Sequence, residues 1–125
     1  MGALPSQVSD LVIAVDGAGQ PPQPGFKGYL SIPYKCTING WVLFADQAGS
    51  ASFDVKWTPY SGFPTTTSIV GSANSKLVSQ QSAEVLDVSA LWTKLSFVKG
   101  DVLEFDLLSA STVTFLTLML NITSD

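Results

Sequence analysis

The fold is decided by residues 100–122, which read GDVLEFDLLSASTVTFLTLMLNI. The run at 102–108 alternates apolar and polar side chains, a pattern typical of a strand with one buried and one solvated face. The run at 112–122 is almost wholly apolar, so a strand there needs cover on both sides, from a second sheet or from another subunit. Small residues at 109–111 separate the two runs, and we therefore predict a β-hairpin that closes the chain.

Shorter strand patterns recur along the rest of the chain. In one of them Phe53, Val55 and Trp57 alternate with polar residues, which predicts that these three share a buried face. We predict strands at residues 11–16, 27–32, 37–46, 52–57 and 92–97, with short strands near 66–70 and 83–86.

Glycine and proline mark the connections between these strands. Residues 17–25 contain three glycines and three prolines, which predicts a loop. Residues 47–50 read as a turn, and residues 58–88 read as a long loop that carries at most the two short strands. No window keeps the 3.6-residue period over ten residues, so we expect no substantial helix. The pattern predicts an all-β protein, an antiparallel, jelly-roll-like β-sandwich of about eight strands.

Length and hydropathy predict a single domain outside the membrane. The 125 residues suffice for one core, and we assign residues 1–10 to an N-terminal arm and residues 11–125 to the β-sandwich. The longest apolar runs, 11–15 and 41–45, have five residues each, whereas a membrane-spanning helix needs about 20. Because no secretory signal pattern precedes the domain, we expect synthesis in a cytoplasm and no membrane insertion.

The charge balance argues against nucleic-acid binding and for a protein partner. Six lysines, no arginine and ten acidic residues give a net charge of −4 with no basic cluster. Charged residues make up only 13% of the chain and hydrophobic residues 46%, so apolar surface is abundant for a small fold. A partner that covers part of this surface is therefore expected.

The residue inventory predicts no catalytic site and no cofactor. Without histidine, the Ser-His-Asp and Cys-His arrangements are excluded. The single cysteine, Cys36, cannot form an internal disulfide, and its strand context predicts a small core side chain. Glu104 and Asp106 project from one strand face and could form the carboxylate pair of a glycosidase. Their apolar neighbours favour the simpler interpretation, a solvated strand face.

Four aspartates fall at predicted strand ends or turns, where a carboxylate can accept backbone N–H bonds or bind calcium. Their spacing does not resemble a calcium-binding loop, so we expect turn capping and no metal site, with a structural cation as the alternative. The four are Asp10, Asp16, Asp46 and Asp101.

Aromatic residues gather around the loop that follows residue 57. Exposed rings on loops are a common means by which β-sandwiches stack on sugars, and the alternative is that these rings close one end of the sandwich or lie in a subunit interface. The residues are Trp57, Tyr60 and Phe63. Trp41 and Trp92 lie inside strand patterns and are predicted in the core.

Several segments, taken in order, resemble a β-sandwich domain that recurs in virion proteins of tailed bacteriophages. The resemblance spans about residues 12–122 and rests on the order of many short matches. These matches are Val15-Asp16-Gly17, residues 26–34, Cys36-Thr37-Ile38, residues 45–50, Asp54-Val55, Phe63-Pro64 and residues 100–108.

The resemblance implies a homotrimeric protein of the virion surface, such as a capsid decoration protein, a head fibre or the distal domain of a tail fibre. We expect a capsid decoration (cement) protein that binds the major capsid protein or another virion protein across capsomer boundaries. The capsid-contact candidates are Leu4, Val8, Pro21 and Pro22.

The alternative function is a tail-fibre-like receptor- or carbohydrate-binding module that recognises a host surface glycan. In that case, the ligand-contact candidates are Trp57, Tyr60 and Phe63.

Overall fold

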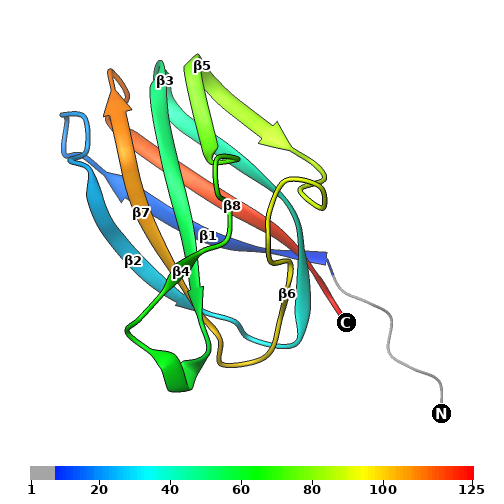
Figure 1. The fold of residues 1–125 in the computed structure, drawn as a ribbon. Helices are drawn as coiled ribbons and strands as arrows, with labels where there is room; N and C mark the ends of the chain where they lie inside the picture. The colour runs from blue at the N-terminus through cyan, green and yellow to red at the C-terminus, as the bar shows by residue number, and fades with distance from the viewer. Residues whose placement is uncertain (1–7) are drawn as a thin grey trace.

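The computed structural model describes residues 8–125, and the strands of this range form one antiparallel sheet in the order β1-β8-β3-β7-β2, with β4, β5 and β6 paired to β3 (Figure 1). The predicted all-β, antiparallel, sandwich-like fold of about eight strands is confirmed. The elements are β1 (Val8–Asp16), β2 (Gly25–Ser31), β3 (Cys36–Thr58), η1 (Tyr60–Gly62, one 3-10 turn), β4 (Thr67–Ser68), β5 (Ser75–Val85), β6 (Ser96–Phe97), β7 (Val102–Ser111) and β8 (Phe115–Ser124).

The long strand β3 bends near its middle and takes part in two layers. It pairs with β8 as far as Ala45 and with β7 from Ser50 onward. Strand β5 follows the other edge of β3 through the same bend. The sheet therefore folds over on itself, and its two halves appear as crossing sets of strands in Figure 1. We call β1, β8 and the first part of β3 layer 1, and β2, β7 and the second part of β3 layer 2.

The predicted hairpin between β7 and β8 is wrong, although both strands lie close to where they were expected. In residues 8–125 no backbone pairing joins the two strands, because each pairs with a different part of β3. The connection at residues 112–114 passes from layer 2 to layer 1 instead of making a tight turn, and it places Val113 in the core. The bend in β3 is the physical cause, since it carries the two partner edges into different layers.

Asp46 holds this crossing connection to the bend. Its carboxylate accepts the N–H groups of Thr114 at 2.8 Å and Phe115 at 3.0 Å, and also the Thr114 hydroxyl. These hydrogen bonds, led by the one from the Thr114 hydroxyl, lower the pKa of Asp46 to about 2. The neighbouring Gln47 amide donates to the carbonyl oxygen of Thr112 at 2.7 Å. The predicted turn-capping role of Asp46 is confirmed.

Two of the other aspartates also cap turns. Asp16 accepts the N–H of Ala18 at 2.8 Å, and Asp101 accepts the N–H of Val98 at 3.1 Å. Asp10 is different, because it lies inside β1 and accepts a hydrogen bond from the Asn121 side chain at 2.7 Å. In residues 8–125 no group of three histidine, cysteine or acidic residues is placed to hold a metal ion.

The core lies between the two layers and receives side chains from both. Trp41, Trp92 and Cys36 are buried there, as predicted, and burial raises the pKa of the Cys36 thiol. The side of the sandwich away from β1 and β2 is closed by residues 69–74 and 86–95. The Trp92 indole N–H bonds to the carbonyl oxygen of Ala73 at 3.0 Å and joins these two segments.

The region predicted as a long loop, residues 58–88, contains the eleven-residue strand β5. Most of its side chains are polar and exposed because β5 pairs only with β3 and lies at the sheet edge. Its strand conformation comes from the backbone pairing with β3, which side-chain composition does not reveal.

Three other boundaries differ from the sequence-based prediction. The predicted turn at 47–50 lies inside β3 as its bend, and the strand predicted at 92–97 shortens to β6. Strand β1 begins at Val8, so the last three residues assigned to the N-terminal arm pair with β8. No helix in the described part of the chain is long and apolar enough to cross a membrane.

The bend depends on a glycine. A Cβ atom at Gly49 would lie 2.6 Å from the carbonyl oxygen of Ser111 and 2.8 Å from Val113 Cγ1.

We therefore predict that Gly49→Ala lowers the free energy of unfolding by about 1–3 kcal/mol through overpacking, measured by urea denaturation. The control Ala48→Ser adds one heavy atom at the next, exposed position and should change stability by less than about 0.5 kcal/mol. Wild-type stability of Gly49→Ala would contradict this account of the bend.

Candidate functional site

The outward face of layer 2 carries four charged side chains in adjacent strand positions. Lys56 lies opposite Glu104, and Asp54 lies opposite Asp106, across the β3–β7 pairing. The Lys56 ammonium is 2.9 Å from Asp106 Oδ2 and 3.8 Å from Glu104 Oε2. We call Asp54, Lys56, Glu104 and Asp106 the acid–lysine cluster. The acid–lysine cluster therefore contains three carboxyl groups and one ammonium group.

The acid–lysine cluster is largely covered. The Glu104 and Asp106 side chains are 13% and 15% exposed. The Thr66 hydroxyl donates to Glu104 at 3.1 Å, and the Ser68 hydroxyl donates to Asp54 at 2.7 Å. The prediction of a solvated strand face is therefore wrong, because the segment containing Thr66 and Ser68 returns over β3 and β7 after η1.

Burial and then a hydrogen bond with Asp106 raise the pKa of Glu104. The hydrogen bond to Asp106 is the main cause that raises the pKa of Lys56. Asp106 Oδ1 is buried and has no hydrogen-bond partner in the described part of the chain. The acid–lysine cluster therefore makes Glu104 easier to protonate than a carboxyl group in water, while Lys56 contacts Asp106 Oδ2.

This geometry differs from that of a glycosidase carboxylate pair. Retaining and inverting enzymes keep their two carboxyl groups about 5 Å and about 6.5–9.5 Å apart to admit a sugar carbon or a water molecule. Glu104 and Asp106 instead hold one ammonium group between them, because Lys56 Nζ is 2.9 Å from Asp106 Oδ2 and 3.8 Å from Glu104 Oε2. The arrangement favours a structural role for the pair.

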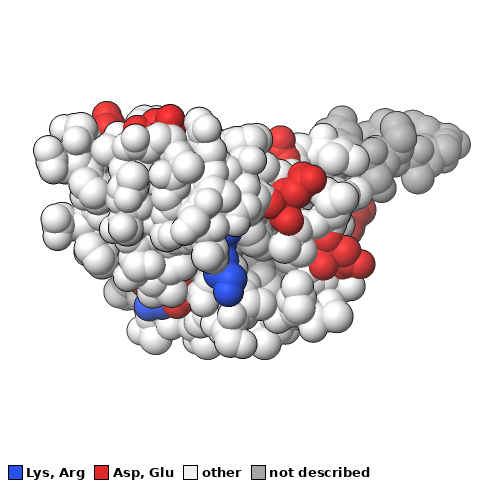
Figure 2. Space-filling model, turned by 90° about the horizontal axis from the view of Figure 1, so that it is seen from above, with Lys and Arg blue, Asp and Glu red and all other residues white. Residues whose placement is uncertain are grey.

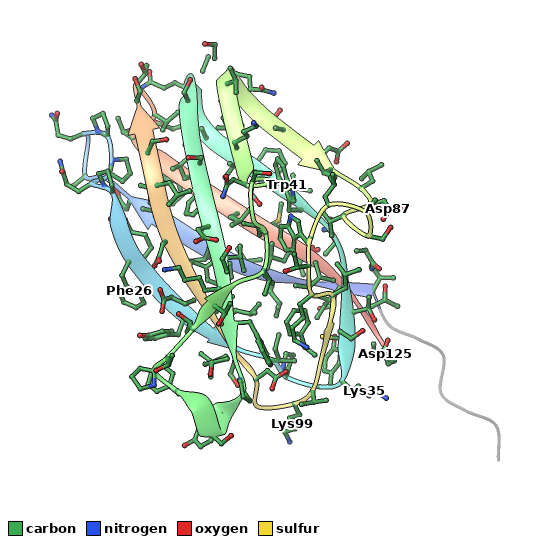
Figure 3. The ribbon with its side chains drawn as sticks, in the orientation of Figure 1. Phe26, Lys35, Trp41, Asp87, Lys99 and Asp125 are labelled. Carbon is green, nitrogen blue, oxygen red and sulfur yellow. The ribbon has the colours of Figure 1, made fainter. Side chains whose placement is uncertain are left out.

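Aromatic rings lie beside the acid–lysine cluster on the same outward face. The Tyr29 ring is 4.7 Å from Phe26 and 4.9 Å from Phe63, measured between ring centres. Figure 3 shows Phe26 on the outer side of β2, whereas Trp41 lies among the strands. With Tyr60, which is 77% exposed in η1, these rings form what we call the aromatic cluster: Phe26, Tyr29, Tyr60 and Phe63.

A β-bulge explains how two of these rings come to share a face. Residues three apart in a regular strand point to opposite sides. In β2 the register shifts between Phe26 and Gly28, so Phe26 lies opposite Asp106 and Tyr29 lies opposite Glu104. Both rings therefore point outward, next to the two carboxyl groups.

An open depression of about 590 Å³ lies against the aromatic cluster. It is lined by Tyr29, Leu30, Ser31, Tyr60, Phe63 and Val102. Of the predicted ligand contacts, Tyr60 and Phe63 are brought together here. Trp57 is not, because it points inward and packs against the core, with the Lys94 ammonium 4.4 Å from its ring centre. Its predicted face, shared with Phe53 and Val55, is confirmed.

Tyr29 was missed by the sequence-based prediction. It lies more than thirty residues before the aromatic loop, and only the β2–β7 pairing brings it to Phe63. The nearby Gly28 signals a bulge, and a bulge would have placed Phe26 and Tyr29 together on one face.

The outward face of layer 1 is apolar instead of charged. Val42 lies opposite Met119, which lies opposite Val12 on β1. Phe44 and Phe115 lie on the same side and are 46% and 39% exposed. We call these residues the layer 1 apolar face: Val12, Val42, Phe44, Phe115 and Met119. Viewed from the end at which β3 bends, most of the molecular surface is uncharged (Figure 2).

The four capsid-contact candidates have different positions. Leu4 lies outside the described residues. Val8 is 78% exposed and lies on the same side of β1 as Val12, and Pro21 is exposed in the loop before β2. Pro22 is buried, so its prediction as a surface contact is wrong. Its neighbours on both sides, Pro21 and Gln23, are exposed.

The fold and faces define an antiparallel, sandwich-like all-β protein with two chemically different outer surfaces. No protein-family model and no curated protein matches the chain. Among solved structures the chain is similar to a chain of the "Structure of infectious bursal disease virus Gx strain", with 8% sequence identity and a TM-score of 0.29. The match covers 95% of this chain but 40% of that chain.

Substitutions in the carboxyl pair should have opposite effects. A carboxyl group with a raised pKa binds its proton more tightly in the folded state, so its contribution to stability is lost as pH rises through the folded pKa. The side chain introduced by Glu104→Gln is uncharged at every pH. The variant should therefore be at least as stable as the wild type at pH 7, and its gain in the free energy of unfolding should be smaller near pH 4. Asp106→Asn weakens the contact with the Lys56 ammonium and should lower the free energy of unfolding by about 1.5–3 kcal/mol at pH 7.

Urea denaturation at the two pH values measures both effects. Lys99→Met, at an exposed position in the turn before β7, is the control for removal of a charge and should stay within about 0.5 kcal/mol of the wild type. Equal destabilisation by Glu104→Gln and Asp106→Asn at pH 7 would contradict the different roles assigned to the two carboxyl groups.

Proposed function

We propose that the chain is a structural protein of a tailed-bacteriophage virion surface, and specifically a capsid decoration protein. The layer 1 apolar face carries this proposal. Three of its five side chains are at least 39% exposed, and Val12, Val42 and Met119 are neighbours across three strands. Such a face is more stable when another protein surface covers it. The resemblance of residues 12–122 to phage virion domains supports the same function.

We further propose that the chain is a homotrimer in which the layer 1 apolar face lies between copies. The face is continuous from β3 across β8 to β1, so one rigid surface carries all the contacts. Acidic residues such as Asp10 and Asp16 lie at the outward side of β1, where they would form the polar rim of such an interface. Contacts between copies would cover the outer side of β8, and the core covers its inner side. Both sides of the apolar run at residues 112–122 would then be covered, as its sequence predicts.

The capsid contacts would come from the start of the chain and from the loop before β2. Val8 is exposed at the beginning of β1, and residues 1–7 with Leu4 precede it. Pro21 adds an exposed apolar group. Three linked copies would hold neighbouring capsomers together, and the binding free energy of each trimer would stabilise the closed shell.

The proposed role requires no catalysis. The absence of histidine and the contacts of both Glu104 and Asp106 with the Lys56 ammonium favour this part of the proposal. Virion surface localisation and the major capsid protein as partner belong to the same proposal.

The homotrimer is tested by light scattering coupled to size-exclusion chromatography. The wild type should have about three times the chain mass of 13.2 kDa at micromolar concentration. Phe44→Asp places a carboxylate in the layer 1 apolar face and should give a folded monomer, because Phe44 is partly exposed and does not fill the core. Far-ultraviolet circular dichroism checks that the variant is folded. A wild-type monomer, or a Phe44→Asp trimer, would contradict the proposed interface.

Capsid binding is tested by co-sedimentation with capsids that lack the protein. Deletion of residues 1–7 leaves β1 complete and should weaken capsid binding about tenfold, because their contacts with the capsid are lost. Tyr60→Ala, on the opposite face of the sandwich, is the control and should bind as the wild type does. Unchanged binding of the truncated protein would reject the arm contact, and an intact protein that never sediments with capsids would reject the decoration function.

A further inference from the structure

We propose that the aromatic depression on layer 2 is a binding site for a neutral polysaccharide built from pyranose sugars. This binding activity is separate from the proposed virion role, because it uses the opposite outer face. Three rings border one depression, and Tyr60 and Phe63 are 77% and 46% exposed. When several large aromatic side chains are exposed next to one another, they usually mark a site that contacts a ligand or a partner.

Two of the rings that border the depression, Tyr29 and Phe63, are held in place before any ligand arrives. Tyr29 contacts Phe26 on one side and Phe63 on the other, and the Phe63 contact is edge-on, with ring planes inclined by 70°. Tyr29 is carried by β2, which pairs along its length with β7. A binding surface that is already ordered loses little conformational entropy when a ligand binds.

The chemistry of the depression fits one face of a sugar ring. The negative faces of aromatic rings attract the C–H groups of a pyranose, which form its apolar side. The Ser31 and Tyr60 hydroxyls can exchange hydrogen bonds with sugar hydroxyls at the rim. A volume of about 590 Å³ lies within the range of about 300–1,000 Å³ that is typical of ligand sites. The depression thus accommodates a short stretch of polysaccharide.

The acid–lysine cluster determines which sugars fit. Glu104 lies beside Tyr29 across the β2–β7 pairing, and Asp106 lies beside Phe26. Three carboxyl groups lie beside one ammonium group, so the local charge is negative. The carboxyl groups do not line the depression themselves, but their negative charge beside it repels uronates, sialic acids and phosphates. The site therefore favours neutral sugars over anionic ones.

A proline-rich peptide is the competing ligand for an aromatic groove. It presents few N–H or O–H donors, so it could not donate to the oxygen atoms of the Ser31 and Tyr60 hydroxyls that line the depression. Sugar hydroxyls can both donate to these hydroxyls and accept from them. The combination of exposed rings with hydroxyl groups at the rim is thus better matched by a polysaccharide than by a peptide.

Isothermal titration calorimetry of the full chain with short, monovalent probes tests the site. The probes are cellohexaose, maltohexaose, mannohexaose, a galacturonic acid hexamer and a proline-rich decapeptide. At least one neutral hexaose should bind, and the galacturonic acid hexamer should bind at least tenfold more weakly. Tyr60→Ala and Phe63→Ala should each weaken binding about tenfold or more, whereas Tyr60→Phe keeps the ring and should retain most of the affinity.

Leu91→Ala is the matched control. Leu91 is 50% exposed and lines a different depression of about 530 Å³ that has no exposed aromatic ring, so its loss should not change binding. Binding of no neutral hexaose, preference for the galacturonic acid hexamer or the peptide, or an equal loss in Leu91→Ala would each overturn the proposal. Because these probes do not involve the layer 1 apolar face or the capsid, failure here leaves the virion role standing, and the converse also holds.

Discussion

The bend in β3 is the constraint on which the rest of the structure depends. A single 23-residue strand supplies a pairing edge to β8 before the bend and to β7 after it. The segment that crosses between the two layers must be held at the corner, and its backbone N–H groups need hydrogen-bond acceptors there. The Asp46 carboxylate accepts the N–H groups of Thr114 and Phe115, and its pKa of about 2 keeps it ionised at ordinary pH. Gly49 permits the close approach of that connection.

Once the sheet is folded over, the alternation of side chains gives each layer one face in the core and one face outside. The inner faces are alike, because both must fill the same space with Leu, Val and Phe side chains. The outer faces are free to differ. Layer 1 presents an apolar surface suited to a protein partner, and layer 2 presents aromatic rings beside charged groups, suited to a small polar ligand. Two kinds of contact can therefore occur on one small sandwich without competing for surface.

The acid–lysine cluster illustrates how a charge-poor protein places its charges. The chain has six lysines and ten acidic residues, and four of these sixteen lie together, two on β3 and two on β7. Their partial burial makes each interaction stronger than it would be in water, and the Lys56 ammonium and two hydroxyl donors bind the carboxyl groups. The cluster thus stabilises the pairing of β3 with β7 and sets the electrostatic character of the aromatic depression beside it.

The sequence by itself determined the all-β fold class, the shared face of Phe53, Val55 and Trp57, and the absence of histidine-based chemistry. These follow from local periodicity and composition. It could not determine that β7 and β8 lie in different layers, that polar β5 is a strand, or that Trp57 is separated from Tyr60 and Phe63. Only the tertiary structure decided these points, because each depends on the path of β3 through its bend. The meeting of Tyr29 with Phe63 likewise required long-range strand pairing and a β-bulge, and the periodicity of one segment carries no information about the register of its partner.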